Sequence, residues 1–110
     1  MSIQQDSGTL LVLLYDEKVR GRYPEYGHMS EKTKWPQHRL TLAISYLGDK
    51  GLIKAHTMAG LPWPNPAIVT YDVTPQGIDI VENKKDFKRT FGISVGLPGI
   101  FSLKFDATQK

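Results

Sequence analysis

The side chains best suited to contact another molecule lie close together in the sequence, between residues 32 and 45. These seven side chains carry charge or form hydrogen bonds: Lys32, Lys34, Gln37, His38, Arg39, Thr41 and Ser45. Amide, hydroxyl and guanidinium groups of this kind bind the polar edges of bases and the oxygens of phosphates. Every amphipathic helix also has a solvated polar face, so an ordinary helix surface is the alternative interpretation.

Other kinds of chemistry find little support in the sequence. His28, His38 and His56 lack the spacing of metal ligands, and the chain contains no cysteine. It has no Gly-x-Ser-x-Gly motif, no phosphate-binding glycine loop before a helix and no carboxylate pair with an obvious shared site. We therefore expect no enzymatic activity, no cofactor and no metal.

The composition is that of a globular domain with a basic excess. The 110 residues suit one domain, and 14 Lys and Arg against 11 Asp and Glu give a net charge of +3. The resulting pI near 9.2 permits nucleic-acid binding without requiring it. The longest apolar run, residues 10–15, is too short to span a bilayer, and Asp6 lies where a signal peptide would carry positive charge. With the absence of cysteine, this leads us to expect a cytoplasmic protein without a membrane segment.

A predicted helix over residues 36–50 positions most of the candidate contact residues. Its apolar face consists of residues three and four positions apart: Leu40, Ala43, Ile44 and Leu47. Pro36 suits the first helical position, and Gly51 suits the left-handed residue that ends a helix. The helix therefore turns its polar residues away from the core.

The segments before this helix are less regular. Ser7 is the expected N-cap of a helix over residues 8–18, although the apolar run within it is also compatible with a buried strand. Residues 20–35 are interrupted by Pro24 and Gly27 and show no amphipathic period. We expect a loop there with at most one helical turn starting at Ser30, and no helix longer than about two turns.

The segments after this helix predict a hairpin and a further helix. Residues 52–58 and 67–74 have the composition of two strands joined by a short loop. Thr74 is expected to cap a helix that begins at Pro75 and continues into the basic stretch 83–91. That stretch contains four cations, which we expect to complement the dipole at the end of the helix: Lys84, Lys85, Lys88 and Arg89.

Two segments in this order of elements resemble the winged helix-turn-helix family, in particular small prokaryotic regulators of the MarR and PadR type. "ISYLGDKGLIKA", residues 44–55, is similar to the end of that family's recognition helix as it enters the first wing strand. "YDVTPQGIDIVE", residues 71–82, is similar to the second wing strand passing into the next helix. The resemblance covers about residues 8–83.

The resemblance implies both a fold and a function. The fold class would be α+β, with a winged helix-turn-helix domain over residues 1–90. The function would be that of a small transcriptional regulator, a possible homodimer, that binds double-stranded DNA and reads the major groove with helix 36–50.

Residues 91–110 lie outside the resemblance and predict an added C-terminal β-hairpin. Two amphipathic strands flank a turn at residues 98–99, and Phe101 and Phe105 lie on the apolar face of the second strand. An isolated hairpin is marginally stable in water. We therefore expect this one to pack on its own domain or on another chain.

The composition of the expected wing favours a different function. No basic side chain lies between Lys54 and Lys84, so the wing lacks the cations with which this family contacts DNA. Trp63, between two prolines, either contacts a partner protein or folds back over the sheet. The alternative is a winged-helix module for protein–protein contact, with Trp63, Phe101 and Phe105 on its docking surfaces.

Overall fold

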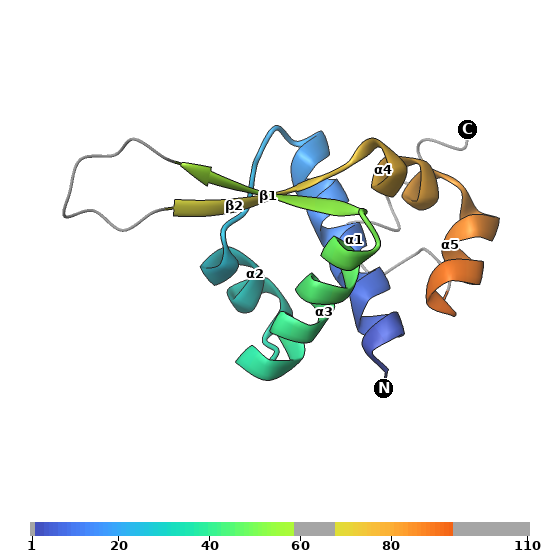
Figure 1. Ribbon diagram of the computed structural model, residues 1–110, viewed down its shortest axis with the longest axis horizontal. Coiled ribbons are helices and arrows are strands. Elements are labelled where there is room, and N and C mark those ends of the chain that lie inside the picture. Colours follow the sequence, from blue (N-terminus) through green and yellow to red (C-terminus); the bar gives the residue numbers. More distant parts are fainter. Residues whose placement is uncertain (1, 59–67, 94–110) are drawn as a thin grey trace.

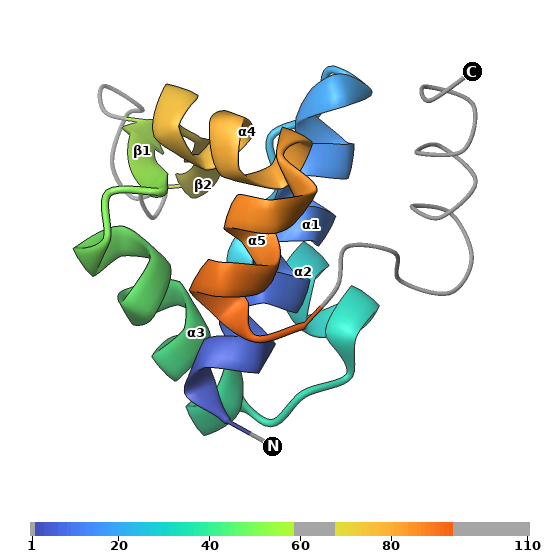
Figure 2. The same cartoon turned by 90° about the vertical axis from the view of Figure 1, so that its right-hand side faces the viewer.

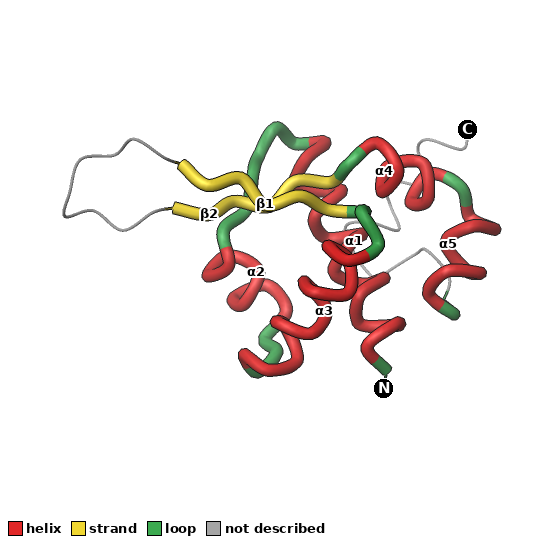
Figure 3. The backbone as a smooth tube through the Cα atoms, in the orientation of Figure 1, coloured by secondary structure: helices red, strands yellow, loops and turns green. Residues whose placement is uncertain are grey.

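The computed structural model describes residues 2–58 and 68–93, which form an α+β arrangement (Figures 1 and 3). Within these residues there are five helices and one two-stranded antiparallel sheet. In chain order the elements are α1 (Ile3–Val19), α2 (Tyr26–Thr33), α3 (Gln37–Asp49), β1 (Ile53–Met58), β2 (Ile68–Val73), α4 (Pro75–Glu82) and α5 (Lys84–Phe91). The hairpin predicted after helix 36–50 is confirmed by the pairing of β1 with β2, and the predicted α+β class is confirmed as well.

Helix α1 is the central element, against which α3, β2, α4 and α5 all pack. Its apolar run forms much of the core through Leu10, Leu11, Val12 and Leu14, all at most 1% exposed, so the helical interpretation of this run is confirmed. The predicted start of this helix, with Ser7 as its N-cap, was wrong. Ser2 is the N-cap and accepts a hydrogen bond from the Gln5 N–H at 3.1 Å. Ser7 lies inside the helix, where its hydroxyl donates to the Ile3 carbonyl at 2.6 Å.

Helix α2 corrects the expectation of a single turn starting at Ser30, because it begins at Tyr26. Long-range contacts organise this segment: the Tyr71 N–H donates to the Pro24 carbonyl at 3.0 Å, and Met29 is fully buried. Such contacts override the weak local preference. The broader expectation holds, since the eight residues of α2 make about two turns.

Helix α3 is one residue shorter at each end than predicted, and Pro36 is its N-cap rather than its first residue. Its C-terminus has the predicted form. Gly51 adopts φ 72° and donates to the Gly48 carbonyl at 3.0 Å, while the Leu52 N–H donates to the Leu47 carbonyl at 3.0 Å. These two bonds define a Schellman motif, which delivers the chain directly into β1.

The hairpin pairs β1 with β2 so that Ile53 opposes Val73 and Lys54 opposes Asp72. Ile53 and Val73 are buried in the core, while Lys54 is exposed. Alternation along each strand thus gives the sheet one apolar face at its base.

The chain after the hairpin forms two helices where one was expected. Thr74 caps α4 as predicted, accepting from the Gly77 N–H at 3.2 Å. However, α4 ends at Glu82, and Asn83 in an extended conformation caps α5 by accepting from the Asp86 N–H at 3.1 Å. The break lets Phe87 and Phe91, both fully buried, reach the core.

The hairpin and α5 lie at opposite ends of the molecule (Figure 1). Figure 2 looks along the long axis and places α5 in front of α1, with α3 beside it. Trp63, Phe101 and Phe105 lie outside the described residues, as do residues 94–110 of the predicted C-terminal hairpin. Phe91, the first residue assigned to that hairpin segment, is instead the last residue of α5.

Candidate functional site

The outer surface of α3 carries most of the predicted contact residues. Gln37, His38, Thr41 and Ser45 are all exposed, and we call this set the α3 polar face. Leu42 adds one apolar side chain to the same surface, with a relative exposure of 36%. The surface therefore offers amide, imidazole and hydroxyl groups, which form hydrogen bonds in either direction.

The opposite side of α3 is fixed in the core. Leu40, Ala43 and Leu47 are all fully buried, and α1 is their main packing partner. The Ser7 hydroxyl of α1 also lies 3.5 Å from the Ala43 carbonyl, at the limit of a hydrogen bond. Because this inner side is immobilised by packing, the direction of the α3 polar face is fixed relative to the rest of the domain.

Arg39 differs from the other predicted contact residues, because it is engaged inside the protein. Its guanidinium donates to Asp6 of α1 through Nε at 2.7 Å and Nη2 at 2.8 Å. It also stacks on Trp35, 4.4 Å from the ring centroid. Hydrogen bonding to Asp6 raises the pKa of Arg39. Arg39 therefore ties the start of α3 to α1 and presents little unneutralised charge to a partner.

Lys32 and Lys34 are exposed at the end of α2, directly before α3. Lys34 adopts the left-handed conformation with φ 60°, and its N–H donates to the Ser30 carbonyl at 2.9 Å, which closes α2. No other described residue forms an ion pair with either lysine. Both charges are available to an anionic partner beside the N-terminus of α3.

A buried carboxylate fixes α2, and sequence reasoning missed it. The Glu17 side chain is only 3% exposed, and its Oε2 accepts from Nη2 of Arg22 at 3.0 Å. Nε2 of His28, on α2, lies 3.0 Å from the other oxygen, without the geometry of a hydrogen bond. The cluster joins α1, the α1–α2 connection and α2. The sequence gives no local indication of this cluster, because its residues come together only when α1 and α2 pack against each other.

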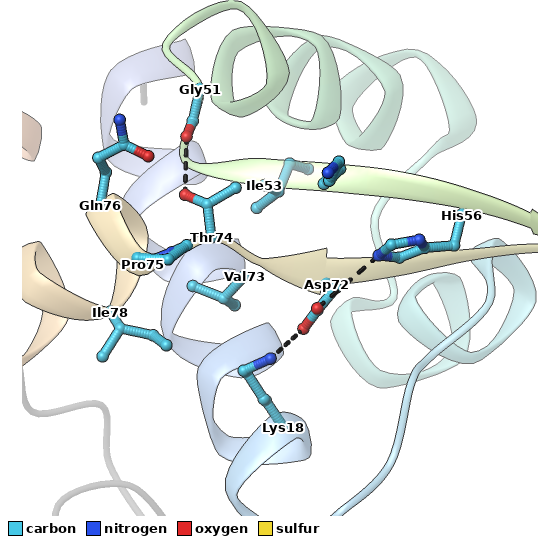
Figure 4. A pocket seen from close by; sticks show the side chains of 11 residues that line it. Lys18, Gly51, Ile53, His56, Asp72, Val73, Thr74, Pro75, Gln76 and Ile78 are labelled. Carbon is cyan, nitrogen blue, oxygen red and sulfur yellow. Dashed lines mark hydrogen bonds and ion pairs between the residues drawn. The ribbon is translucent and has the colours of Figure 1, made fainter.

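A concave surface lies between the hairpin, the end of α1 and the start of α4 (Figure 4). It encloses about 550 Å³ over an apolar floor that includes Ile53, Val73 and Ile78. Lys18 Nζ lies 2.7 Å from Asp72 Oδ1, and His56 Nε2 lies 3.8 Å from Asp72 Oδ2. Lys18 and Asp72 therefore neutralise each other, whereas Lys54, which also lines this pocket, forms no ion pair with another described residue.

The described residues contain no group of three or more His, Cys, Asp or Glu side chains arranged to hold a metal ion. Over the same part of the chain, no helix has both the length and the apolar character needed to cross a membrane. The structure thus brings together Lys32, Lys34 and the α3 polar face, and it separates Arg39 from them. Comparison with protein-family models, with curated proteins and with solved structures found no match.

Proposed function

We propose that this protein is a winged helix-turn-helix protein that binds double-stranded DNA and acts as a small transcriptional regulator. The order of elements supports this proposal: α2 and α3 are joined by residues 34–36, and α3 passes through a Schellman turn into the two-stranded hairpin. In the proposed docking, α3 enters the major groove and the hairpin serves as the wing.

The observation that carries the proposal is that α3 has one side buried in the core and an exposed polar side. Leu40, Ala43 and Leu47 on its inner side are fully buried. Its outward side carries exposed polar side chains on a helix that cannot rotate without unpacking the core: Gln37, His38, Thr41 and Ser45. Side chains with donors and acceptors in a fixed array can distinguish base pairs in the major groove.

The positions of the exposed cations agree with this docking. Lys32 and Lys34 lie beside the N-terminus of α3, where they would contact the phosphate strand that borders the groove. The pI near 9.2 favours association with a polyanion. We further propose that the protein is cytoplasmic and works as a homodimer, since regulators of this kind bind paired half-sites.

The test is binding to a selected operator and to random duplex DNA, followed by fluorescence anisotropy. Gln37→Ala, Thr41→Ala and Ser45→Ala should each weaken operator binding by about 1–3 kcal/mol and leave random-duplex binding nearly unchanged. Gln76→Ala is the matched control, because Gln76 is an exposed glutamine in the first turn of α4. Equal operator affinities for wild type and all three α3 variants would remove the α3 polar face from the binding surface.

Two observations favour the alternative function, a winged-helix module for protein–protein contact. The sequence has no lysine or arginine between Lys54 and Lys84, and the exposed surface of α3 includes Leu42. If wild type shows no salt-dependent affinity for any duplex, the protein-docking function becomes the leading one.

A further inference from the structure

Helix α5 exposes four cations on its outer side. They are Lys84, Lys85, Lys88 and Arg89, and we call this set the α5 basic face. The inner side of the same helix holds Phe87 and Phe91, both fully buried. Arg89 lies 3.6 Å from Asp86, but none of the three lysines forms an ion pair with another described residue.

The helix dipole does not account for this arrangement. Because Asn83 starts a new helix, Lys84 and Lys85 occupy the first turn of α5, where the dipole presents its positive end. A cation at that end is disfavoured by the dipole. Only Lys88 and Arg89, in the last turn, complement the dipole as the sequence predicted.

The spacing of the cations also opposes helix formation. Lys84 and Lys88 are four residues apart, as are Lys85 and Arg89, so two pairs of like charges face each other along the helix surface. Each such pair destabilises a helix through like-charge repulsion. Folding of α5 is therefore maintained by its phenylalanines against the repulsion on its outer side. A surface with this charge pattern is stabilised by an external polyanion.

The α5 basic face and the α3 polar face point in different directions. On α1, Ser7 contacts α3 through the Ala43 carbonyl, while the next residue, Gly8, packs against Phe91 of α5. Consecutive residues of a helix project about 100° apart. Figure 2 shows the same divergence, with α3 to one side of α1 and α5 in front of it.

We propose that the α5 basic face binds the phosphate backbone of duplex DNA, at a segment separate from the one contacted by α3. This inference rests on the proposed function and extends it by a second, sequence-independent contact surface. Duplex DNA carries one charge per about 1.7 Å, so an eight-residue helix about 12 Å long faces several phosphates. Its lysines would be neutralised without a specific base sequence.

The test compares the salt dependence of binding to random duplex DNA for wild type and for Lys84→Gln/Lys85→Gln/Lys88→Gln. Loss of three phosphate contacts should flatten the slope of log K against log salt by about 2–3 units. The control Lys84→Arg/Lys85→Arg/Lys88→Arg keeps the charge and should keep the wild-type slope.

The Gln variant should melt no lower than wild type, because it removes like-charge pairs. If the triple variant unfolds, Lys84→Gln and Lys88→Gln tested singly should each flatten the slope by about one unit.

The outcomes separate this inference from the proposed function. A wild-type slope in the Gln variant would overturn the α5 contact and leave DNA binding by α3 intact. Absence of duplex binding by wild type would overturn both. Tighter wild-type binding to single-stranded RNA than to duplex DNA, lost in the Gln variant, would overturn the assignment of duplex DNA as the partner.

Discussion

Asp6 and Arg39 form a two-pronged ion pair that joins α1 to the first turn of α3, with N–O distances of 2.7 and 2.8 Å. The Asp6 side chain is 12% exposed and that of Arg39 is 29% exposed, so both charges are largely removed from water. A planar guanidinium that meets a carboxylate through two hydrogen bonds is among the stronger ion pairs in proteins. The pair therefore couples the position of α3 to that of α1.

Arg39→Ala tests whether this pair is structural. The change leaves Asp6 without its partner and should lower the free energy of unfolding by about 1–2 kcal/mol, measured by urea denaturation. If DNA binds as proposed, the salt slope of binding should remain at its wild-type value, because Asp6 already neutralises the guanidinium. A slope flattened by about one unit, without loss of stability, would instead show that Arg39 contacts a phosphate.

Asp6→Asn tests the same pair from the other side. The amide keeps the size of the carboxylate but not its charge, so Arg39 gains an unneutralised positive charge beside the α3 polar face. We expect random-duplex binding to strengthen at low salt, with a slope steeper by about one unit. Asp79→Asn, an exposed carboxylate on α4, is the matched control for a gain of one net positive charge. Equal slopes for the two variants would show that the effect is not local to Arg39.

The sequence predicts those features whose causes lie within a few residues. Gly51 ends α3 in the expected left-handed conformation, and the Thr74 hydroxyl caps α4 as expected. In both cases the deciding hydrogen bonds join neighbours in the chain, so the residue types are sufficient to predict them. The polar side of α3 was predictable for the same reason, since helical periodicity depends only on spacing.

The remaining features depend on contacts between residues distant in the sequence. Asp6 and Arg39 are 33 residues apart, so nothing local indicated that this arginine was already paired. The start of α2 depends on the bridge between Glu25 and Thr70, and Met29 supplies its only fully buried side chain. The division between α4 and α5 is required to bury Phe87 and Phe91 against α1, which the sequence periodicity did not reveal.

Gly8 lies at a close approach of α1 and α5. A Cβ atom at this position would lie 2.7 Å from Cβ of Phe91 and 3.3 Å from Cζ of Phe87. Gly8→Ala should therefore destabilise the fold by about 1–3 kcal/mol through overpacking, despite the better helix propensity of alanine. Gly48→Ala is the control, since that position in α3 has open space around it, and it should stabilise the fold by up to about 1 kcal/mol. Thermal denaturation of both variants measures the contrast, and a stabilised Gly8→Ala variant would contradict the close packing.

Arg22 is expected to matter far more for stability than Arg89, although both are surface arginines in ion pairs. Arg22 contacts the buried Glu17 carboxylate, whereas Arg89 lies 3.6 Å from a half-exposed Asp86. Arg22→Ala leaves the Glu17 carboxylate with only His28 nearby and should cost about 1–3 kcal/mol. Arg89→Ala should stay within about 0.5 kcal/mol of wild type. Equal losses in urea denaturation would show that Glu17 does not depend on its arginine partner.

Tyr15 links α1 to the end of α4 through a hydrogen bond from its hydroxyl to Glu82 Oε2 at 2.6 Å. Burial, and then the hydrogen bond and charge of Glu82, raise the pKa of the Tyr15 phenol from 10.0 to about 12. Because the folded-state pKa lies above the unfolded value, the neutral phenol stabilises the fold fully below pH 10, and this contribution is lost as the pH rises toward 12. The phenolate absorbance that develops near pH 12 should be smaller in Tyr15→Phe than in wild type, by the contribution of one tyrosine. Glu82→Gln should lower the pKa of Tyr15 only partly, since burial is the larger cause. An unchanged alkaline titration in Tyr15→Phe would contradict the assignment.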